Sequence, residues 1–404
     1  MTLPEELFAE LDRRLTPGDA LRLARYPGEW PERQPVHTCY VPADAVEPQL
    51  AAAWGTGALA ALDEHGLPDL GIDPELVEEV LPRVRFKLSS EPVEDLRVDA
   101  EDGYRRGGEH EDDDVLAAAA VLAADLEAGV APPSIGIRGK SLEAHSRHRG
   151  VRSLDLFLGA LPGRRAVVTL PKVTDVEQVA AFLPVLEALQ AAHGVTLDLE
   201  LQIETPQAVI GPDGTATLAR MVHVAGPRLI GLHYGTYDYS AALGIAAGYQ
   251  AADHPAADFA KQLMQVAAAT TGVRVVDGST NVLPVGPREH VHAAWKVHSR
   301  LVRRALHRGF YQGWDLHPAQ LVTRYVATYA FFRAAVPDAG ARLAAYLDRA
   351  DGGVLDEPAT ARALAGVLLR GLDCGAVDEA EVQAAGGPER AILDRLAGRR
   401  PGGS

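Results

Sequence analysis

Glu204 and Asp238 each follow a strand-like segment of the sequence, at positions where a carboxylate needs a positive partner. Glu204 comes directly after the run 199–203 (LELQI), which is typical of a buried strand, and Asp238 follows the next such segment along the chain. A buried carboxylate without a cation is costly. Two carboxylates, completed by substrate and water oxygens, suit the octahedral coordination of Mg²⁺. We therefore predict that Glu204 and Asp238 bind Mg²⁺, with Mn²⁺ as the alternative ion. Cysteine and histidine ligands are not grouped in the sequence, which disfavours Zn²⁺.

Other strand-like segments also end in charged residues. Glu101 and Asp102 follow one segment, Arg138 ends another, and Lys172 follows a third. An acidic protein that binds a carboxylate substrate needs a local cation, and a guanidinium can hold a carboxylate through two parallel hydrogen bonds. Asp277 and His317 also lie at the ends of strand-like segments. Charged residues at such positions can have a purely structural role: Lys172 could simply pair with a carboxylate, Asp277 could cap a helix and His317 could be structural.

The middle of the chain alternates short apolar segments with amphipathic helical segments. Such alternation predicts a parallel sheet covered by helices. Helices are expected at 115–128, 175–192, 254–270 and 290–307, the second opened by a capping box at 174–177. The expected strands are 37–41, 95–99, 134–138, 166–170, 197–204, 228–233, 272–277 and 313–317.

Eight such units over roughly 280 residues favour an α/β fold of the closed (β/α)₈ type, the TIM barrel. A doubly wound open sheet is the alternative, but it usually has a glycine-rich loop after its first strand, and residues 40–44 contain no glycine. In a barrel of this kind the loops at the carboxyl ends of the strands carry the chemistry. The charged residues named above therefore belong to one rim.

The barrel is expected to carry additional segments at both ends. We predict an N-terminal helical segment over residues 1–36, a catalytic barrel over 37–335 and a small helical C-terminal domain over 336–404, which serves as a lid or oligomerisation domain. A helix opens at Asp73-Pro74, which supplies an N-cap and a proline at the first helical position. The alternation of residues 83–88 predicts an extra strand after that helix.

Composition excludes several classes of function. The formal net charge of −16 disfavours nucleic acid and anionic membrane surfaces as partners. The two cysteines, Cys39 and Cys374, lie far apart and predict neither a disulfide framework nor a thiolate metal site. The first residues lack the features of a signal peptide, and no run of about 18 apolar residues occurs. We therefore expect a cytoplasmic protein.

The order of these motifs resembles that of the citrate lyase β-subunit and malyl-CoA lyase superfamily, whose barrel the pyruvate aldolases share. The resemblance covers residues 37–320 and rests on seven motifs in the same order, each at a predicted strand end. In this sequence they are 99–103 (DAEDG), Arg138, 170–173 (LPKV), 203–205 (IET), 235–238 (GTYD), 277–278 (DG) and 309–320 (GFYQGWDLHPAQ).

By this resemblance, Glu204 and Asp238 match the Mg²⁺ ligands, and Arg138 matches the arginine that holds the substrate carboxylate. Backbone amides around Gly235 and Thr236 match those that contact a bound oxo acid. Lys172 lies in the matching Pro-Lys-Val context and is included among the substrate-binding residues. The superfamily also has an aspartate in a C-terminal segment that reaches the site of a neighbouring subunit.

The residue that matches this aspartate is Asp356, in the segment 353–358 (GVLDEP). The resemblance then implies a homo-oligomer, a trimer or a hexamer. Asp356 becomes the first candidate for the acid or base, with the pair Glu101 and Asp102 next. The alternative interpretation is that Asp356 merely N-caps the following helix.

The resemblance implies a Mg²⁺-dependent carbon–carbon lyase or aldolase that acts through an enolate on a small 2-oxo or 2-hydroxy carboxylate or its CoA thioester. The contexts 204–206 (ETP) and 237–239 (YDY) are also similar to malate synthase, so a condensing enzyme of that kind is the alternative. A Schiff-base aldolase is disfavoured because the sixth expected strand has no lysine. A non-catalytic carboxylate-binding protein on the same barrel remains the non-enzyme alternative, as does a subunit of a larger lyase complex.

Overall fold

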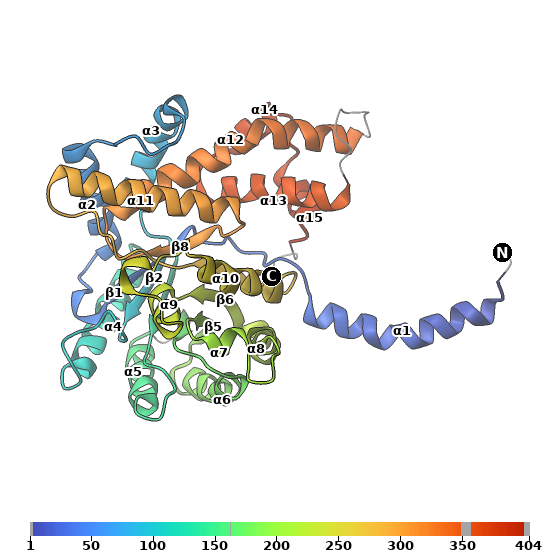
Figure 1. The fold of residues 1–404 in the computed structure, drawn as a ribbon, viewed down its shortest axis with the longest axis horizontal. Helices are drawn as coiled ribbons and strands as arrows, with labels where there is room; N and C mark the ends of the chain where they lie inside the picture. The colour runs from blue at the N-terminus through green and yellow to red at the C-terminus, as the bar shows by residue number, and fades with distance from the viewer. Residues whose placement is uncertain (1–2, 162, 349–356, 400–404) are drawn as a thin grey trace.

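The fold is a closed barrel of parallel strands surrounded by helices (Figure 1). The computed structural model describes residues 3–161, 163–348 and 357–399. Within these residues eight strands pair in sequence order, and the last closes onto the first, which confirms the predicted (β/α)₈ barrel. Every predicted strand is present, with its ends within two residues of the expected positions. The strands are β1 His37–Pro42, β2 Asp95–Asp99, β3 Ser134–Arg138, β4 Arg165–Leu170, β5 Thr196–Ile203, β6 Leu229–Tyr234, β7 Arg274–Asp277 and β8 Gln312–Asp315.

The barrel interior is unusually polar. Arg97 on β2 contacts Glu200 on β5 through two hydrogen bonds of 2.7 and 3.1 Å, and it also reaches Asp95 at 2.5 Å. Strands β2 and β5 are not neighbours, so this contact crosses the interior. On β5 the alternate residues Leu199, Leu201 and Ile203 are fully buried in the hydrophobic core. Side chains alternate along a strand, so the polar set of β5 faces inward and the apolar set faces the helices.

The helices that cover the barrel follow the predicted pattern. α6 begins one residue later than the predicted capping box implies: Asp175 is its N-cap and accepts from Gln178 N at 3.0 Å, while the Gln178 side chain accepts from Thr174 N at 2.8 Å. The covering helices are α2 Leu50–His65, α3 Pro74–Ser90, α4 Glu111–Glu127, α5 Arg147–Gly159, α6 Val176–His193, α7 Pro206–Val209, α8 Thr217–Ala225, α9 Thr236–Ala242, α10 Pro255–Ala268 and α11 Arg288–His307. Short 3₁₀ turns lie at Ala43–Ala45, Gly226–Arg228 and Ala247–Tyr249.

The predicted strand at residues 83–88 is wrong, because this segment is the last part of α3. The N-cap Asp73 accepts a hydrogen bond from Glu75 N, as expected. Val80, Val84 and Leu88 recur every four residues and are all buried, whereas Phe86 is 72% exposed. The helical period therefore buries the stripe of Val80, Val84 and Leu88 and leaves Phe86 exposed, whereas a strand would place Val84, Phe86 and Leu88 on one face.

The C-terminal part of the chain is helical. α12 (Gln320–Asp348) runs without interruption from the barrel into this part, so residue 336, the predicted start of a C-terminal domain, lies inside a helix. α13 (Pro358–Cys374), α14 (Glu379–Ala384) and α15 (Arg390–Ala397) pack with the end of α12 around a second apolar core. Asp356 lies outside the described residues.

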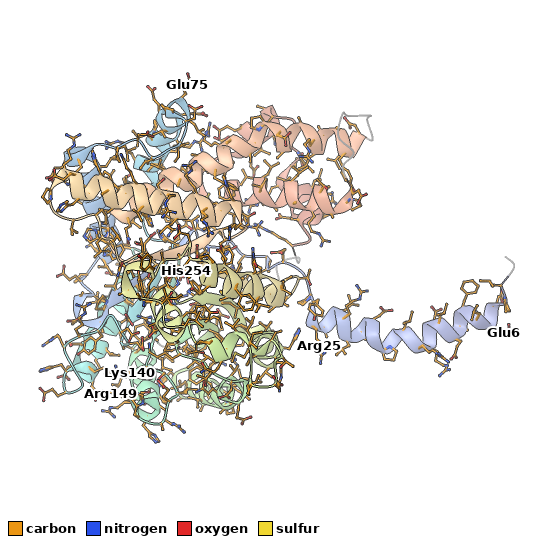
Figure 2. The ribbon with its side chains drawn as sticks, in the orientation of Figure 1. Glu6, Arg25, Glu75, Lys140, Arg149 and His254 are labelled. Atoms are coloured by element: carbon orange, nitrogen blue, oxygen red, sulfur yellow. The ribbon has the colours of Figure 1, made fainter. Side chains whose placement is uncertain are left out.

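α1 (Glu5–Arg25) stands apart from the rest of the protein (Figures 1 and 2). None of its residues is buried. No helix in the described ranges is both long and apolar enough to cross a membrane.

The ion pair inside the barrel gives a first prediction. Arg97→Met leaves Asp95 and Glu200 buried without their guanidinium, and breaking a buried pair in this way costs about 3–5 kcal/mol. We expect the free energy of unfolding, measured by urea titration, to fall by that amount. Arg14→Met on the exposed helix α1 is the control and should leave it unchanged. A loss of less than about 1 kcal/mol for Arg97→Met would mean that the interior charges do not hold the barrel together.

Candidate active site

Glu204 lies at the carboxyl end of β5 and is 1% exposed. Its Oε1 accepts a hydrogen bond of 2.8 Å from the backbone N–H of Lys172, and its Oε2 accepts from the side chain of Gln202. Burial raises the pKa of Glu204 to about 8; Lys172 opposes this rise and Asp238 adds to it. Glu204 is therefore a buried carboxylate that the protein alone does not fully neutralise.

Lys172 joins the loops of four strands at this rim. Its Nζ lies 3.1 Å from Glu101, 2.7 Å from Asp102 and 3.2 Å from Asp238. Burial acts to lower the pKa of Lys172, but Glu204, Glu101 and Asp102 raise it well above its usual range. Its φ of 51° is left-handed, which is uncommon for a residue other than glycine. This conformation directs the backbone N–H to Glu204 while the side chain reaches the other carboxylates.

The structure thus brings the predicted residues Glu101, Asp102, Glu204 and Asp238 together around Lys172, and we call these four the carboxylate cluster. Glu101 is 8% exposed, while the side chains of Asp102 and Asp238 are 55% and 45% exposed. Burial raises the pKa of Glu101 against the opposing effects of Arg138 and Lys172. Burial acts to raise the pKa of Asp102 too, but Lys172, Glu101 and Arg138 together outweigh burial and lower this pKa.

Arg138 is buried beside the cluster, but its side chain already holds a carboxylate. Its Nε and Nη2 donate to the two oxygens of Asp99 at 2.8 and 2.6 Å, and its Nη1 donates to Gln202 at 3.1 Å. The guanidinium also lies over the rings of Tyr40 and Trp314, 4.9 and 5.7 Å from their centroids. The two-atom fork expected for a substrate is therefore occupied by Asp99. Three of the five N–H groups of Arg138 make these bonds. The other two have no hydrogen bond to a described residue.

The Gly235 amide, one of those expected to contact a bound oxo acid, has a backbone partner in the structure. Gly235 N donates to Ile203 O at 3.0 Å and so belongs to the fold rather than to a ligand. Gly235 instead provides room, since a Cβ there would lie 2.4 Å from Glu204 Cβ and 2.5 Å from its Oε2. Thr236 is 2% exposed, and its hydroxyl donates to Ser279 O at 3.2 Å.

Asp277 and His317, which belong to two of the motifs and for which a structural interpretation was the alternative, have local partners. Asp277 pairs with the buried Lys261 at 2.8 Å and accepts from Gly278 N, so it neutralises a lysine as well as closing a turn. His317 Nδ1 accepts from Ala319 N at 3.2 Å. Asp356, the first candidate for the acid or base, lies outside the described residues.

Sequence reasoning missed Asp99, Gln202, Tyr40 and Trp314 as supports of the site. A signal for Gln202 was present: polar residues recur at every second position of β5, at 198, 200, 202 and 204, which indicates that one face of this strand is polar. Asp99 lies in the same motif as Glu101, but nothing in the sequence pairs it with Arg138. That pairing arises from the register, because β2 and β3 place the two residues directly side by side.

The residues at this rim fit a hard divalent cation. Asp99 and the four members of the carboxylate cluster face two cations, Arg138 and Lys172. Glu204 and Asp238 offer oxygen ligands from adjacent strands. No group of three or more His, Cys, Asp or Glu residues suited to a metal occurs in the described residues. A two-carboxylate site would leave the other positions to water and substrate, as Mg²⁺ sites commonly do.

Comparisons with known proteins agree with the fold. A family model described as Domain of unknown function (DUF6986) matches residues 15–401. No curated protein matches the sequence. A citrate lyase structure from Burkholderia xenovorans LB400 is 20% identical, with a TM-score of 0.58 over 89% of this chain and 98% of that one.

Two further structures are less similar. CitE from Mycobacterium tuberculosis, in complex with magnesium, acetoacetate and coenzyme A, is 17% identical over 85% of this chain and 98% of that one, with a TM-score of 0.49. A malate synthase from Haloferax volcanii is 14% identical over 72% of each chain, also with a TM-score of 0.49. We base the likeness of fold on the Burkholderia structure alone.

The close approach at Gly235 gives a second prediction. Gly235→Ala places a methyl group against Glu204, and overpacking of this kind costs about 1–3 kcal/mol. We expect that loss in the free energy of unfolding measured in urea. Gly248→Ala is the matched control, because nothing lies within 4 Å of a Cβ built there. Equal stability of the two variants would show that Glu204 does not pack against Gly235.

Proposed function

This chain belongs to the DUF6986 family, whose description names no activity, and we propose from its rim residues that it is a Mg²⁺-dependent carbon–carbon lyase or aldolase. Its substrate is a small 2-oxo or 2-hydroxy carboxylate, or the CoA thioester of one. The observation that carries the proposal is the buried carboxylate of Glu204, which shares Lys172 with Asp238 at the end of the barrel where enzymes of this fold do their chemistry. The order of the seven motifs supports the type of reaction.

Glu204 and Asp238 would hold the ion. When bound, Mg²⁺ acts as a Lewis acid on a substrate oxygen. The ion also relieves the excess of carboxylates over cations at the rim. Lys172 would keep its contacts with Glu101 and Asp102.

Arg138 supplies the positive charge for the substrate carboxylate. Asp99 and the rings of Tyr40 and Trp314 fix its orientation, so little side-chain entropy is lost when a substrate meets the two remaining N–H groups. The site therefore has a fixed cation in a strongly acidic protein, as the binding of a small anion requires.

The reaction also needs a proton carrier. Cleavage of the carbon–carbon bond removes a proton from a hydroxyl group and delivers one to the carbon that keeps the bonding electrons. Glu101 suits this role within the described residues, because burial raises its pKa and it lies between Lys172 and Arg138. Asp102 is half exposed and has a lowered pKa, which suits a partner of Lys172 better.

Removal of a metal ligand gives a third prediction. Mg²⁺ should raise the melting temperature of the EDTA-treated wild type, and Glu204→Gln and Asp238→Asn should each abolish this rise, since an amide is a poor substitute for a carboxylate ligand. Both variants should also lose turnover in a screen of 2-oxo acids and CoA thioesters with Mg²⁺. Glu187→Gln, at an exposed position of α6, is the matched control and should behave as wild type.

The two readouts separate the metal from the reaction. A full Mg²⁺-dependent rise in Glu204→Gln would exclude Glu204 as a ligand. A rise in the wild type without turnover of any compound in the screen would favour the carboxylate-binding alternative over the lyase.

The fourth prediction concerns Arg138→Lys, which keeps the charge but loses the planar guanidinium. We expect kcat/KM for the substrate that emerges from the screen to fall about 100-fold or more, because one hydrogen bond to a charged group is worth about 1.5–3 kcal/mol and this change removes more than one. The Mg²⁺-dependent rise in melting temperature should persist, since Arg138 is not a ligand. Unchanged kinetics in this variant would remove Arg138 from the substrate site.

A further inference from the structure

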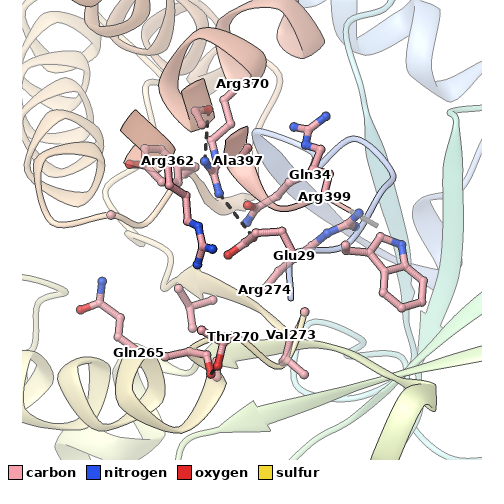
Figure 3. A pocket seen from close by; sticks show the side chains of 18 of the residues that line it. Glu29, Gln34, Gln265, Thr270, Val273, Arg274, Arg362, Arg370, Ala397 and Arg399 are labelled. Atoms are coloured by element: carbon pink, nitrogen blue, oxygen red, sulfur yellow. Dashed lines mark hydrogen bonds and ion pairs between the residues drawn. The ribbon is translucent and has the colours of Figure 1, made fainter. Parts of the chain in front are cut away.

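A pocket of about 390 Å³ lies at the opposite end of the barrel from Glu204, and Figure 3 shows side chains that line it. Its lining includes Arg274, the first residue of β7, and Tyr311, which directly precedes β8. All strands of the barrel are parallel, so their starting ends lie together, away from the rim that carries the carboxylate cluster. We call this cavity the base pocket.

The base pocket lies between the barrel and the C-terminal helices. Arg362 and Arg370 of α13 line one side, with Ala397 of α15 beside them, and residues 272–275 line the other. Figure 3 shows side chains from both parts directed into the same space. Its volume lies within the range of about 300–1,000 Å³ that is usual for small-molecule sites.

The cations of the base pocket exceed its anions. Arg362 has no hydrogen bond or ion pair with any residue that the structure describes. Arg370 has a buried Nε without a partner in these ranges, and its Nη2 is 3.8 Å from Glu29, too far for a hydrogen bond. Arg274 donates to two backbone carbonyl oxygens, those of Glu32 and Arg33, at 3.2 and 2.9 Å.

The other charged residues of the lining have partners of opposite charge. Arg399 pairs with Asp373 at 2.6 Å, and Glu32 pairs with Arg165 at 2.9 Å. Glu29 therefore remains as the one acidic side chain of the lining that faces three arginines. Positive charge is therefore in excess among the side chains that line the pocket, although the chain as a whole carries a formal charge of −16.

We propose that the base pocket binds a compact organic or inorganic dianion, a phosphate group or a dicarboxylate. Three guanidinium groups, those of Arg274, Arg362 and Arg370, line one cavity, and such groups recognise the oxygens of both chemistries through parallel hydrogen bonds. The Arg370 guanidinium lies 4.4 Å from the centroid of the Tyr311 ring, which fixes its plane. The ligand bridges α13 and the start of β7, so its binding holds the C-terminal helices against the base of the barrel.

Calorimetric titration of the full chain in EDTA tests this site without Mg²⁺ at the rim. Inorganic phosphate and succinate are the two dianion probes, and acetate is the monoanion control. We expect one site per chain for at least one dianion, with binding at least 10-fold tighter than that of acetate. Phosphate alone would assign the site to phosphate compounds, and succinate alone would assign it to dicarboxylates.

Arg362→Gln is the diagnostic variant, because it removes a charge that has no partner among the described residues and so leaves the fold intact. It should weaken binding about 10-fold or more, in line with the loss of a hydrogen bond to a charged group. Arg220→Gln, at an exposed position of α8, is the matched control and should bind as wild type. Absence of dianion binding, equal binding of acetate, or wild-type affinity in Arg362→Gln would each overturn the proposal.

Discussion

The pairing of buried charges inside the barrel is the interaction on which the rest of this structure depends. Barrel interiors of this type are usually filled by branched apolar side chains, yet here Arg97 lies between Asp95 and Glu200, all at most 3% exposed. Asp315 is likewise held by Arg324, through two hydrogen bonds of 3.0 Å each, and by His37 and His298. An uncompensated buried charge costs several kcal/mol, so the barrel closes only when each charge meets its partner.

This pairing is incomplete at the rim, where the proposed active site lies. Arg138 pairs with Asp99. Among the described residues, this leaves Lys172 as the remaining cation that pairs with the carboxylate cluster. Glu204 is the most buried residue of the carboxylate cluster. Its pKa of about 8 follows from this burial, which Lys172 only partly offsets. The raised pKa of Glu204 is thus a consequence of barrel closure, which fixes the strand ends whether or not the nearby charges balance.

The sequence predicted the features that depend on local periodicity. It did not predict the side-chain contacts that form only when the barrel closes. All eight strands and the grouping of Glu204 with Asp238 follow from alternating segments and their ends. The contact of Arg97 with Glu200 depends on strand tilt and register, which no short segment encodes. The apolar residues of 83–88 fit the period of a helix as well as that of a strand. The segment is helical, and Val84 and Leu88 are buried against the rest of the protein. The left-handed backbone of Lys172 carries no sequence signal, because it is imposed by the contacts that Lys172 makes.

The two ends of the barrel therefore carry opposite charge excesses, and the paired interior keeps them separate. β7 joins both ends directly, since Arg274 begins it in the base pocket and Asp277 ends it at the rim. Three residues of strand span roughly 10 Å, a distance over which two bare charges in a protein interior would interact strongly. Lys261 neutralises Asp277, and the pairs around Arg97 fill the space between the two ends. A fold that must bury charge in matched pairs can thus present an acidic rim and a basic pocket on one barrel without either neutralising the other.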